Sequence, residues 1–269
     1  MSDFEIAGDE ESIIQRIIME LSDLFPEKGF YRLSLGHLTT RDTGKVDIEI
    51  RSRFPFFGLQ DTPKVIHQIR LDNSGDFPAI LSSNVRRKIS RAEKNGVVVK
   101  KGGQELVPDF TRVYNRNIQR IGSPTLGKKF FLTMADQADL IAEVFVAYLE
   151  GKAIGGSFSV WYDHYYENLW FATLRDYNKL YTSYLLHAEM IKSALKHHST
   201  IYSLGRSTKG SGVYHYKRQW PVKEIPIYFS RSVTTGISLK QQKWLTVLWK
   251  FVPPPVADAV GPFFARKMY

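Results

Sequence analysis

Residues 205–220 gather the side chains of this sequence that are best suited to chemistry on a charged substrate. The stretch reads GRSTKGSGVYHYKRQW, so a run of glycine, serine and threonine precedes tyrosine, lysine and arginine donors. Glycine permits positive φ and close backbone approach, which lets N–H groups meet an oxyanion or a phosphate. The stretch therefore predicts an anion-binding loop or, in a plainer interpretation, a surface loop between two strands.

One well-known class of phosphate loop is excluded at this position. Gly205 and Gly210 have the glycine spacing of the loop found in nucleoside triphosphatases, which requires a lysine directly after the second glycine. Ser211 occupies that position here. The sequence therefore does not predict a nucleoside triphosphatase.

A second candidate site is the basic segment of residues 83–95, which the spacing of its side chains predicts to be a helix ending at Gly96. Its apolar face consists of Val85, Ile89 and Ala92. Another face carries three cations at the spacing i, i+4, i+7, namely Arg87, Arg91 and Lys94. Such a face is either a solvated helix surface or a cradle for a phosphate-rich ligand, because like charges at this spacing repel unless an anion lies between them.

Composition narrows the possible classes of protein. The 269 residues are 43% hydrophobic and carry a formal net charge of +10, which is suited to a globular chain that binds polyanions. Cysteine is absent from the sequence, which excludes disulfides, thiolate metal sites and cysteine nucleophiles. His197 and His198 are consecutive and point in different directions on a helix, so no metal site is predicted. We expect a cytoplasmic protein, because residues 1–11 are acidic and no apolar run approaches ~20 residues.

Hydrophobic periodicity predicts the elements that position these residues. The first part is a small α/β unit, with a helix over residues 12–24 and strands over 31–38, 45–53 and 66–71. After the basic helix we expect strand 97–101, helices 108–121 and 128–135, strands 143–149, 154–162 and 165–174, and a helix over 179–197. Two more strands flank the stretch at 205–220. A final helix over 240–252 should end at the prolines 253–255.

Four segments resemble FemAB-like acyltransferases, a branch of the GNAT superfamily, particularly those associated with exopolysaccharide gene clusters. They are the basic helix at 83–97, the segment IGSPTLGKKFF at 121–131, residues 204–220, and Trp249, Pro253 and Gly261-Pro262 in the tail. The resemblance implies an α/β GNAT fold, with a mixed, largely antiparallel central sheet flanked by helices. It also implies a partial N-terminal GNAT-like unit at 1–96, a complete GNAT domain at 97–230, and a C-terminal amphipathic tail at 231–269.

The same resemblance implies an enzyme that transfers an acyl or aminoacyl group to an amine of a cell-envelope or exopolysaccharide precursor, without a metal and without DNA as a partner. The donor stays open between acyl-coenzyme A and aminoacyl-tRNA. Residues 175–179 lack the glycine-containing run by which ordinary GNAT enzymes hold the pyrophosphate of coenzyme A. The basic surface suits the phosphates of a tRNA or of a nucleotide-linked acceptor.

Roles for single residues follow from the resemblance and from the needs of acyl transfer. Lys217 aligns with a lysine at the leaving end of the donor, which implies charge stabilisation, and Tyr216 would support donor placement. Tyr214 or His215 would hand a proton to the leaving group, and Glu167 or Asp176 would act as base. The expected donor- and acceptor-binding residues are Arg206, Ser207, Gly205, Gly212, Arg87, Arg91, Lys94, Asn178 and Lys179.

Two alternative functions remain open. One is an ordinary N-acetyltransferase that uses acetyl-coenzyme A, and the other is a non-catalytic basic module that binds RNA or anionic lipid. The tail has two interpretations as well, because a short helix with tryptophan and lysine either packs on the main body or contacts the inner face of the cytoplasmic membrane.

Overall fold

The computed structural model describes residues 32–35, 59–71, 77–136, 141–162, 164–231 and 247–268. The helix predicted over residues 12–24, the strand over 45–53 and most of the helix over 240–252 lie outside these ranges.

The described strands form one mixed sheet in the order β1-β8-β2-β7-β6-β5-β4-β3. In chain order, the strands are β1 (Arg32–Leu35), β2 (Leu59–Arg70), β3 (Val98–Gly102), β4 (Ile141–Leu149), β5 (Lys152–Tyr162), β6 (Tyr165–Thr173), β7 (Ile201–Thr208) and β8 (Lys223–Arg231). Strands β3 to β6 pair antiparallel, whereas β6 and β7 pair parallel. The predicted fold class is therefore confirmed.

The described helices are α3 (Phe77–Ile80), α4 (Ser83–Lys94), α5 (Val107–Ile121), α6 (Lys128–Ala135), α7 (Thr182–Lys196), α8 (Gly212–Lys217) and α10 (Pro254–Met268), with short 3-10 turns η1 (Gln104–Leu106) and η2 (Arg175–Leu180). Helices α4 to α7 fall in the predicted order, whereas α3 and α10 were not predicted. The chain divides into two compact units. One includes β1, β8, residues 59–67 of β2 and residues 206–216, and the other includes residues 68–205, 217–222 and the C-terminal segment. The division at residues 96 and 230 stays a prediction.

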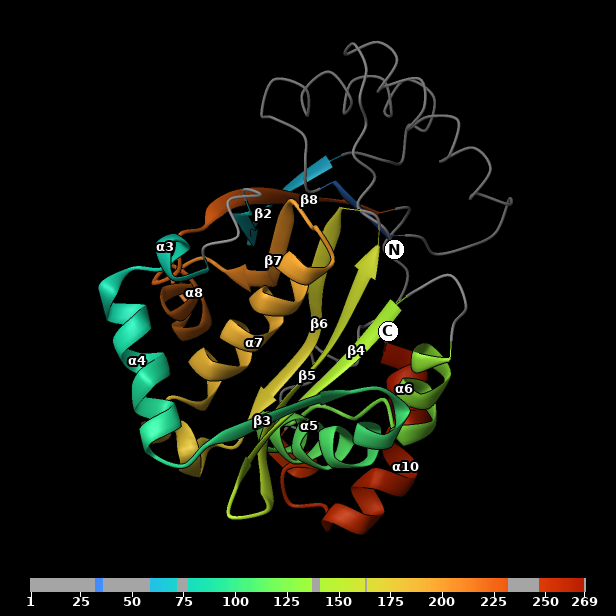
Figure 1. Cartoon of the computed structure of the whole chain (residues 1–269). Coiled ribbons are helices and arrows are strands. Elements are labelled where there is room, and N and C mark those ends of the chain that lie inside the picture. Colours follow the sequence, from blue (N-terminus) through green and yellow to red (C-terminus); the bar gives the residue numbers. More distant parts are fainter. Residues whose placement is uncertain are drawn as a thin grey trace. The chain divides into compact units, whose positions relative to one another are not determined.

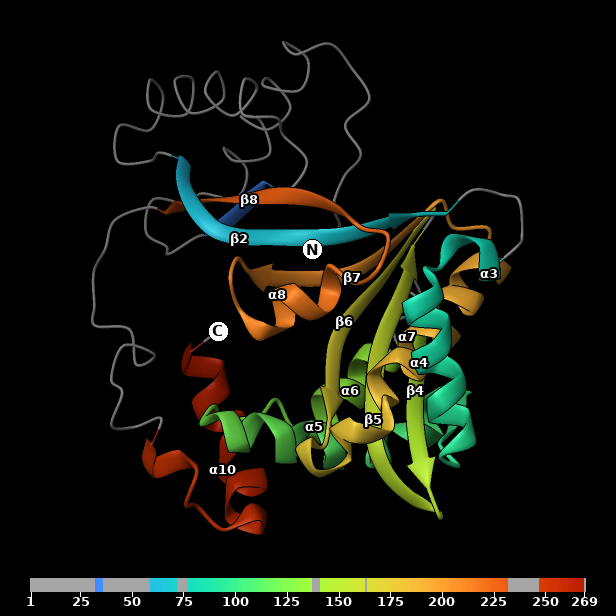
Figure 2. The same cartoon turned by 90° about the vertical axis from the view of Figure 1, so that its left-hand side faces the viewer.

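In the larger unit, α5 and α7 pack on opposite faces of β5 (Figures 1 and 2). A Cβ atom at Gly155 would lie 2.9 Å from Thr182 Cγ2 of α7, and one at Gly156 would lie 3.0 Å from Phe110 Cδ2 of α5. The two glycines thus let both helices approach the strand closely. A β-bulge also lies next to this pair, because the register of β4 and β5 shifts between Ala147 and Tyr148.

An aromatic cluster fills the core under α5 and α6. Phe131 contacts Phe110, Phe158 and Trp170 with ring centroids 5.0, 5.7 and 5.4 Å apart. The three phenylalanines are fully buried. The segment FF that follows Lys128-Lys129 in the sequence therefore anchors α6 to the sheet, because Phe130 also packs against Trp170 at 5.4 Å.

Several predicted helix ends are confirmed, and one is wrong. Gly96 and Gly122 follow α4 and α5 with φ of +79° and +93°, the left-handed conformation that ends a helix. The helix predicted from residue 179 begins only at Thr182, because residues 175–180 form the 3-10 turn η2 and Tyr181 has φ of +59°. The helix expected to end at the prolines is described only from residue 247, and it does end before Pro253; the helix that begins at Pro254 was not predicted.

Helix α10 starts at Pro254, and the N–H of Ala257 donates to the carbonyl of Pro253 at 2.9 Å. Proline is well tolerated in the first turn, where backbone N–H groups have no intrahelical acceptor. None of the described helices is both long and apolar enough to cross a bilayer.

Candidate acyl-transfer site

The candidate site lies where β6 and β7 separate. The parallel pairing runs from Tyr165 opposite Ile201 to Glu167 opposite Ser203, so the strands are in register over three residues only. Gly205 follows with φ of +74°, and a Cβ atom there would lie 3.2 Å from the backbone oxygen of Asn168. Parallel strands that part after a short pairing leave backbone groups at the opening for side chains or a ligand.

Lys217 places a buried cation at this opening. It is the last residue of α8, its side chain is 7% exposed, and its Nζ donates to the carbonyl oxygen of Gly205 at 2.9 Å. A buried ammonium acts in a low dielectric, where its field on a developing negative charge is far stronger than in water. The residue that the sequence singles out for charge stabilisation is therefore buried and bonded to the backbone of Gly205.

His187 of α7 lies beside this lysine and is kept neutral. Burial, together with the charge of Lys217, lowers the pKa of His187 from 6.5 to about 3. Its Nδ1 is 2.6 Å from the hydroxyl of Tyr202, and its ring stacks on Phe171 with centroids 4.7 Å apart. A neutral imidazole adds no second positive charge next to Lys217, so the ammonium stays the dominant charge of the site.

The low pKa of His187 predicts a loss of stability in acid. The unfolded chain takes up a proton near pH 6.5, whereas the folded chain does so only near pH 3. Above pH 6.5 the titration of His187 does not change the free energy of unfolding. As the pH falls below 6.5, it lowers this free energy by up to about 1.4 kcal/mol per pH unit. Urea unfolding at pH 7 and pH 5.5 should show a smaller difference for His187→Gln than for the wild type. Equal differences in the two proteins would show that His187 does not titrate in this way.

Lys88 of the basic helix α4 contacts the segment that follows Lys217. Its Nζ donates to the hydroxyl of Tyr184 at 3.0 Å and to Oε1 of Gln219, and it lies 4.6 Å from the ring centroid of Tyr184. The Tyr184 hydroxyl also donates to Gln219 at 2.8 Å, and its ring stacks on Trp220. The N–H of Trp220 in turn donates to the carbonyl of Lys217 at 3.1 Å. Helix α4 thereby fixes the chain on the C-terminal side of the candidate catalytic residue.

We expect Lys88 and Gln219 to be coupled in stability. Lys88→Met and Gln219→Leu should each lower the free energy of unfolding by about 1–2 kcal/mol, because each removes a charge-assisted hydrogen bond. The double variant should lose less than the sum of the two, by at least about 0.5 kcal/mol. Arg86→Met, an exposed change on the same helix, should add independently to Gln219→Leu. Additive losses for Lys88 and Gln219 would contradict the coupling. Urea unfolding of the six proteins measures these values.

The smaller unit holds six of the predicted site residues, among them the exposed His215. Several of their polar groups bond within the protein. Ser207 is buried, and its Oγ lies 2.8 Å from Nε2 of His67. The Tyr214 hydroxyl donates to Oε2 of Glu224 at 3.2 Å, and the Tyr214 ring meets His67 edge-on. Arg206 and Gly212 are exposed, and Tyr216 is half-buried.

Part of the stretch predicted to bind an anion, residues 205–220, uses its N–H groups within the fold. Strand β7 continues through Arg206 to Thr208, so half of the stretch is strand rather than loop. The N–H of Gly205 donates to Oγ of Ser203, that of Lys209 to the carbonyl of Pro63, and that of Ser211 to the carbonyl of Thr208. These donors are therefore satisfied inside the protein.

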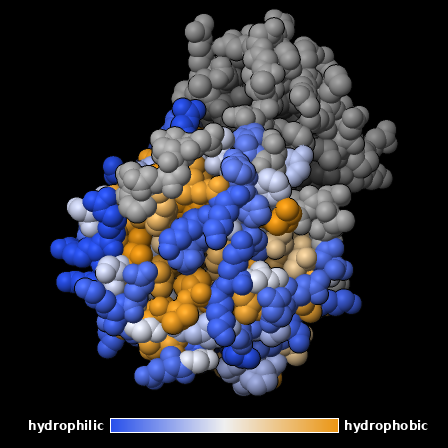
Figure 3. All heavy atoms as spheres, viewed as in Figure 1, coloured by the Kyte–Doolittle hydropathy of each residue, from blue (hydrophilic) through white to orange (hydrophobic). Residues whose placement is uncertain are grey.

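The other predicted site residues belong to the larger unit and do not form one cluster. Glu167 is half-buried at the last paired position of β6, and its Oε1 accepts from Ser203 Oγ at 3.4 Å. The basic residues Arg87, Arg91 and Lys94 are exposed on α4, which forms a hydrophilic edge at the left of Figure 3. Asn178 and Lys179 are exposed in η2, as is Asp176.

Glu143 of β4 was not among the predicted site residues, although it is the centre of a buried polar cluster. Its carboxylate accepts from Ser193 Oγ and Tyr166 Oη, each at 2.6 Å, lies 2.9 Å from His197 Nε2, and is paired with Lys101. Burial by itself raises the pKa of Glu143, but these hydrogen bonds outweigh it and lower the pKa to about 2. The carboxylate is therefore ionised and fully bonded, as expected of a structural group rather than a base.

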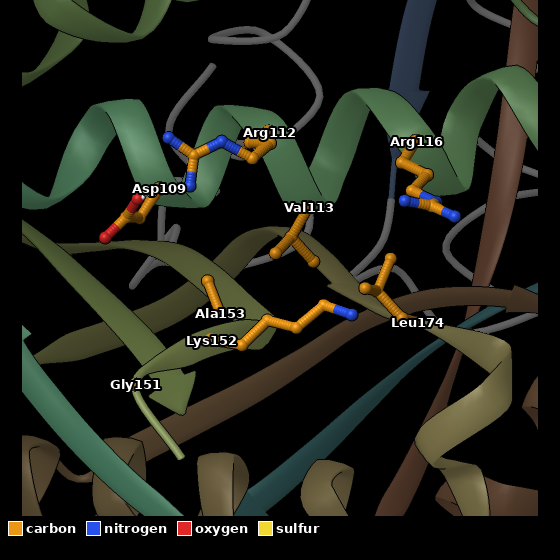
Figure 4. Close-up of a pocket in the computed structure, with 8 residues that line it drawn as sticks. All are labelled: Asp109, Arg112, Val113, Arg116, Gly151, Lys152, Ala153 and Leu174. Carbon is orange, nitrogen blue, oxygen red and sulfur yellow. Dashed lines mark hydrogen bonds and ion pairs between the residues drawn. The ribbon is translucent and has the colours of Figure 1, made fainter. Parts of the chain in front are cut away.

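A pocket of about 130 Å³ lies between α5 and the start of β5 (Figure 4). Arg112 and Arg116 project from α5, and the side chain of Lys152 extends toward Leu174. Arg112 is paired with Asp109 at 2.8 Å. The pocket is smaller than the roughly 300–1,000 Å³ typical of sites for whole small molecules, so it could hold no more than a small part of a donor. Among the described residues, no group of three or more histidine or acidic side chains is arranged to hold a metal.

Comparison with known proteins gives a consistent family and fold. Residues 81–218, just over half of the chain, match the family described as the acetyltransferase (GNAT) domain. No curated protein sequence matches the chain. The structure is similar to FemX, with 11% identity, a TM-score of 0.60, and coverage of 90% of this chain and 80% of that chain.

Two further solved structures share the fold. One is the C-terminal domain of a putative lysylphosphatidylglycerol synthetase from Agrobacterium fabrum, at 11% identity and a TM-score of 0.54, covering 84% of this chain and 74% of that chain. The other is a GCN5-related N-acetyltransferase from Kribbella flavida, at 12% identity and a TM-score of 0.51, covering 88% of this chain and 80% of that chain. At such identities the likeness shows the fold alone.

Proposed function

Because the chain belongs to the GNAT acetyltransferase family and has a FemAB-like fold, we propose that it transfers an acyl or aminoacyl group to an amine of a cell-envelope or exopolysaccharide precursor. The observation that carries the proposal is the buried ammonium of Lys217, bonded to Gly205 where β6 and β7 separate. An ammonium removed from water serves catalysis when negative charge develops next to it.

The reaction forms one bond and breaks another at the donor carbonyl carbon. The lone pair of the acceptor nitrogen attacks this carbon, the carbonyl oxygen becomes an oxyanion, and the nitrogen then loses a proton. Collapse of the intermediate expels the donor's sulfur or ribose oxygen, which takes up a proton. We assign Lys217 to the stabilisation of the oxyanion and of the leaving group. Tyr214 and Tyr216 are assigned to proton delivery and donor placement, and Glu167 is our candidate for the base.

The donor is an acyl group on a phosphate-bearing carrier, which is the chemistry that acyl-coenzyme A and aminoacyl-tRNA share. Support comes from the exposed cations Arg87, Arg91 and Lys94 and from the net charge of +10. The similar synthetase is named for lysylphosphatidylglycerol, an aminoacylated membrane lipid. This name supports an acceptor that belongs to the envelope.

A donor panel tests the proposal. The full chain is incubated with acyl-coenzyme A thioesters or aminoacyl-tRNAs, each with lipid-linked and nucleotide-linked amine acceptors, and products are identified by mass spectrometry. An acceptor heavier by one acyl or aminoacyl group is the expected result. Transfer only from acetyl-coenzyme A to simple amines would replace the proposal with an ordinary N-acetyltransferase. RNA or lipid binding without turnover by any donor would overturn it in favour of a binding module.

A further inference from the structure

Helix α10 carries its small residues inward and its large apolar residues outward. Ala257, Gly261 and Ala265, at the spacing i, i+4, i+8, are buried. The exposed side chains at the spacing i, i+4, i+7, i+8 are Val256, Val260, Phe263 and Phe264. A surface helix normally presents polar residues to solvent, and one that is apolar all round is normally covered on every side.

The orientation of α10 is fixed by close contacts to the rest of the larger unit (Figures 1 and 2). A Cβ atom at Gly261 would lie 2.8 Å from Oγ1 of Thr125, and one at Gly127 would lie 2.6 Å from Cγ of Pro262. Asn115 of α5 donates to Oδ1 of Asp258 at 2.7 Å. With no room for a side chain on the inner face, the helix cannot rotate its phenylalanines inward.

The residues just before α10 add further exposed apolar side chains. Phe251 is 78% exposed, and Val247 and Leu248 are exposed as well. Residues 247–268 thus hold seven of the thirteen large hydrophobic side chains that are exposed in the described part of the chain. We call these seven residues the tail surface; they are Val247, Leu248, Phe251, Val256, Val260, Phe263 and Phe264. Such a concentration on a monomer marks a binding surface.

Cations accompany the tail surface. Lys250 is exposed within it, and Lys128 and Lys129 are exposed directly after Gly127, which touches Pro262. Arg266 and Lys267 follow in the sequence. A second copy of the chain docked on this face would bring the same cations together in a protein of net charge +10. An anionic bilayer instead accepts apolar side chains and neutralises flanking cations.

We propose that the tail surface docks on an anionic lipid bilayer, with Phe251 and Phe263 inserted among the acyl chains and the flanking lysines at the headgroups. Docking of this kind does not depend on the transfer reaction, because none of these residues belongs to the site around Lys217. It would hold the protein at a membrane without a spanning helix.

Vesicle sedimentation of the full chain tests this docking. We expect binding to vesicles that contain phosphatidylglycerol, at least tenfold weaker binding to pure phosphatidylcholine, and weaker binding in 0.5 M than in 0.1 M sodium chloride. The double variant Phe251→Ser/Phe263→Ser should bind the anionic vesicles at least tenfold more weakly. Val98→Ser, which removes an equally exposed apolar side chain from β3, should bind as the wild type does.

Three results would overturn the proposal, provided that circular dichroism shows folded proteins. The first is that the wild type does not bind the anionic vesicles, and the second is that the double variant binds them as well as the wild type does. The third is that light scattering shows a dimer for the wild type and a monomer for the double variant. The second would assign lipid binding to cations elsewhere, and the third would assign the tail surface to self-association. None of these results requires enzymatic activity, so they stand apart from the outcome of the donor panel.

Discussion

Replacement of Lys217 by alanine is expected to lower the rate of acyl transfer by about 10²- to 10³-fold, the loss typical when one preorganised oxyanion-stabilising group is removed. Lys217 is 7% exposed and its ammonium is bonded to the Gly205 carbonyl, so water cannot readily replace its charge. Lys217→Met keeps most of the side-chain volume and should lose about as much activity. The rate is measured with the donor and acceptor found in the panel, by mass spectrometry of the product.

Lys209→Ala is the matched control, because Lys209 is an exposed lysine that precedes α8. It should retain the rate of the wild type within about twofold. The thermal midpoint of each variant separates loss of catalysis from loss of fold. A folded Lys217→Met protein with more than a third of the wild-type rate would remove Lys217 from the mechanism, while the proposed reaction itself would stand.

Glu143→Gln is expected to lower the free energy of unfolding by about 2–3 kcal/mol. The carboxylate accepts from Lys101, Ser193 and Tyr166, and an amide in its place presents an N–H₂ group to at least one of these donors. The estimate lies below the full cost of breaking a buried ion pair, because the Lys101 side chain is 44% exposed and keeps part of its hydration. Urea unfolding at pH 7 measures the loss.

The same helix that supplies Ser193 offers a control for this change. Glu189 and Lys192 form an i, i+3 ion pair at 2.6 Å in which both side chains are about a third or more exposed. Glu189→Gln should change the free energy of unfolding by less than about 0.5 kcal/mol. A loss as large as that of Glu143→Gln would mean that removal of a negative charge as such, rather than burial of the carboxylate, governs the effect. A Glu143→Gln protein as stable as the wild type would contradict the structural role of the cluster.

Local pattern was enough to predict most elements of the larger unit. Helix α6 has the predicted bounds of residues 128–135, and α4 and α5 differ from theirs by one residue. Helices α4 and α5 combine clear apolar periodicity with a glycine just after the last turn, and both signals are local. The strand character of residues 206–208 was missed, because glycine, serine and threonine also suit a loop. The bond of Ser207 is to His67, which is 140 residues away in the sequence.

The candidate site was predictable only in part, because its contacts join residues that are far apart in the sequence. Lys217 was singled out by resemblance, and its role stays a prediction, although the structure places it buried beside Gly205. The partners of Lys88 are 96 and 131 residues distant, so nothing in its neighbourhood reveals them. One local signal was available, because Lys88 falls on the helical face of Val85 and Ala92. A cation on an apolar face needs a partner inside the protein.

Gly155 and Gly156 determine how closely α5 and α7 pack on the two faces of the sheet at β5. With no side chain on β5 at this point, the side chains of Thr182 in α7 and Phe110 in α5 pack closer to the strand than a methyl group would permit. Sequence change can therefore be absorbed around the periphery of these helices far more easily than at their crossing with β5. Relatives whose sequences differ almost everywhere else would still keep this close packing of two helices on β5.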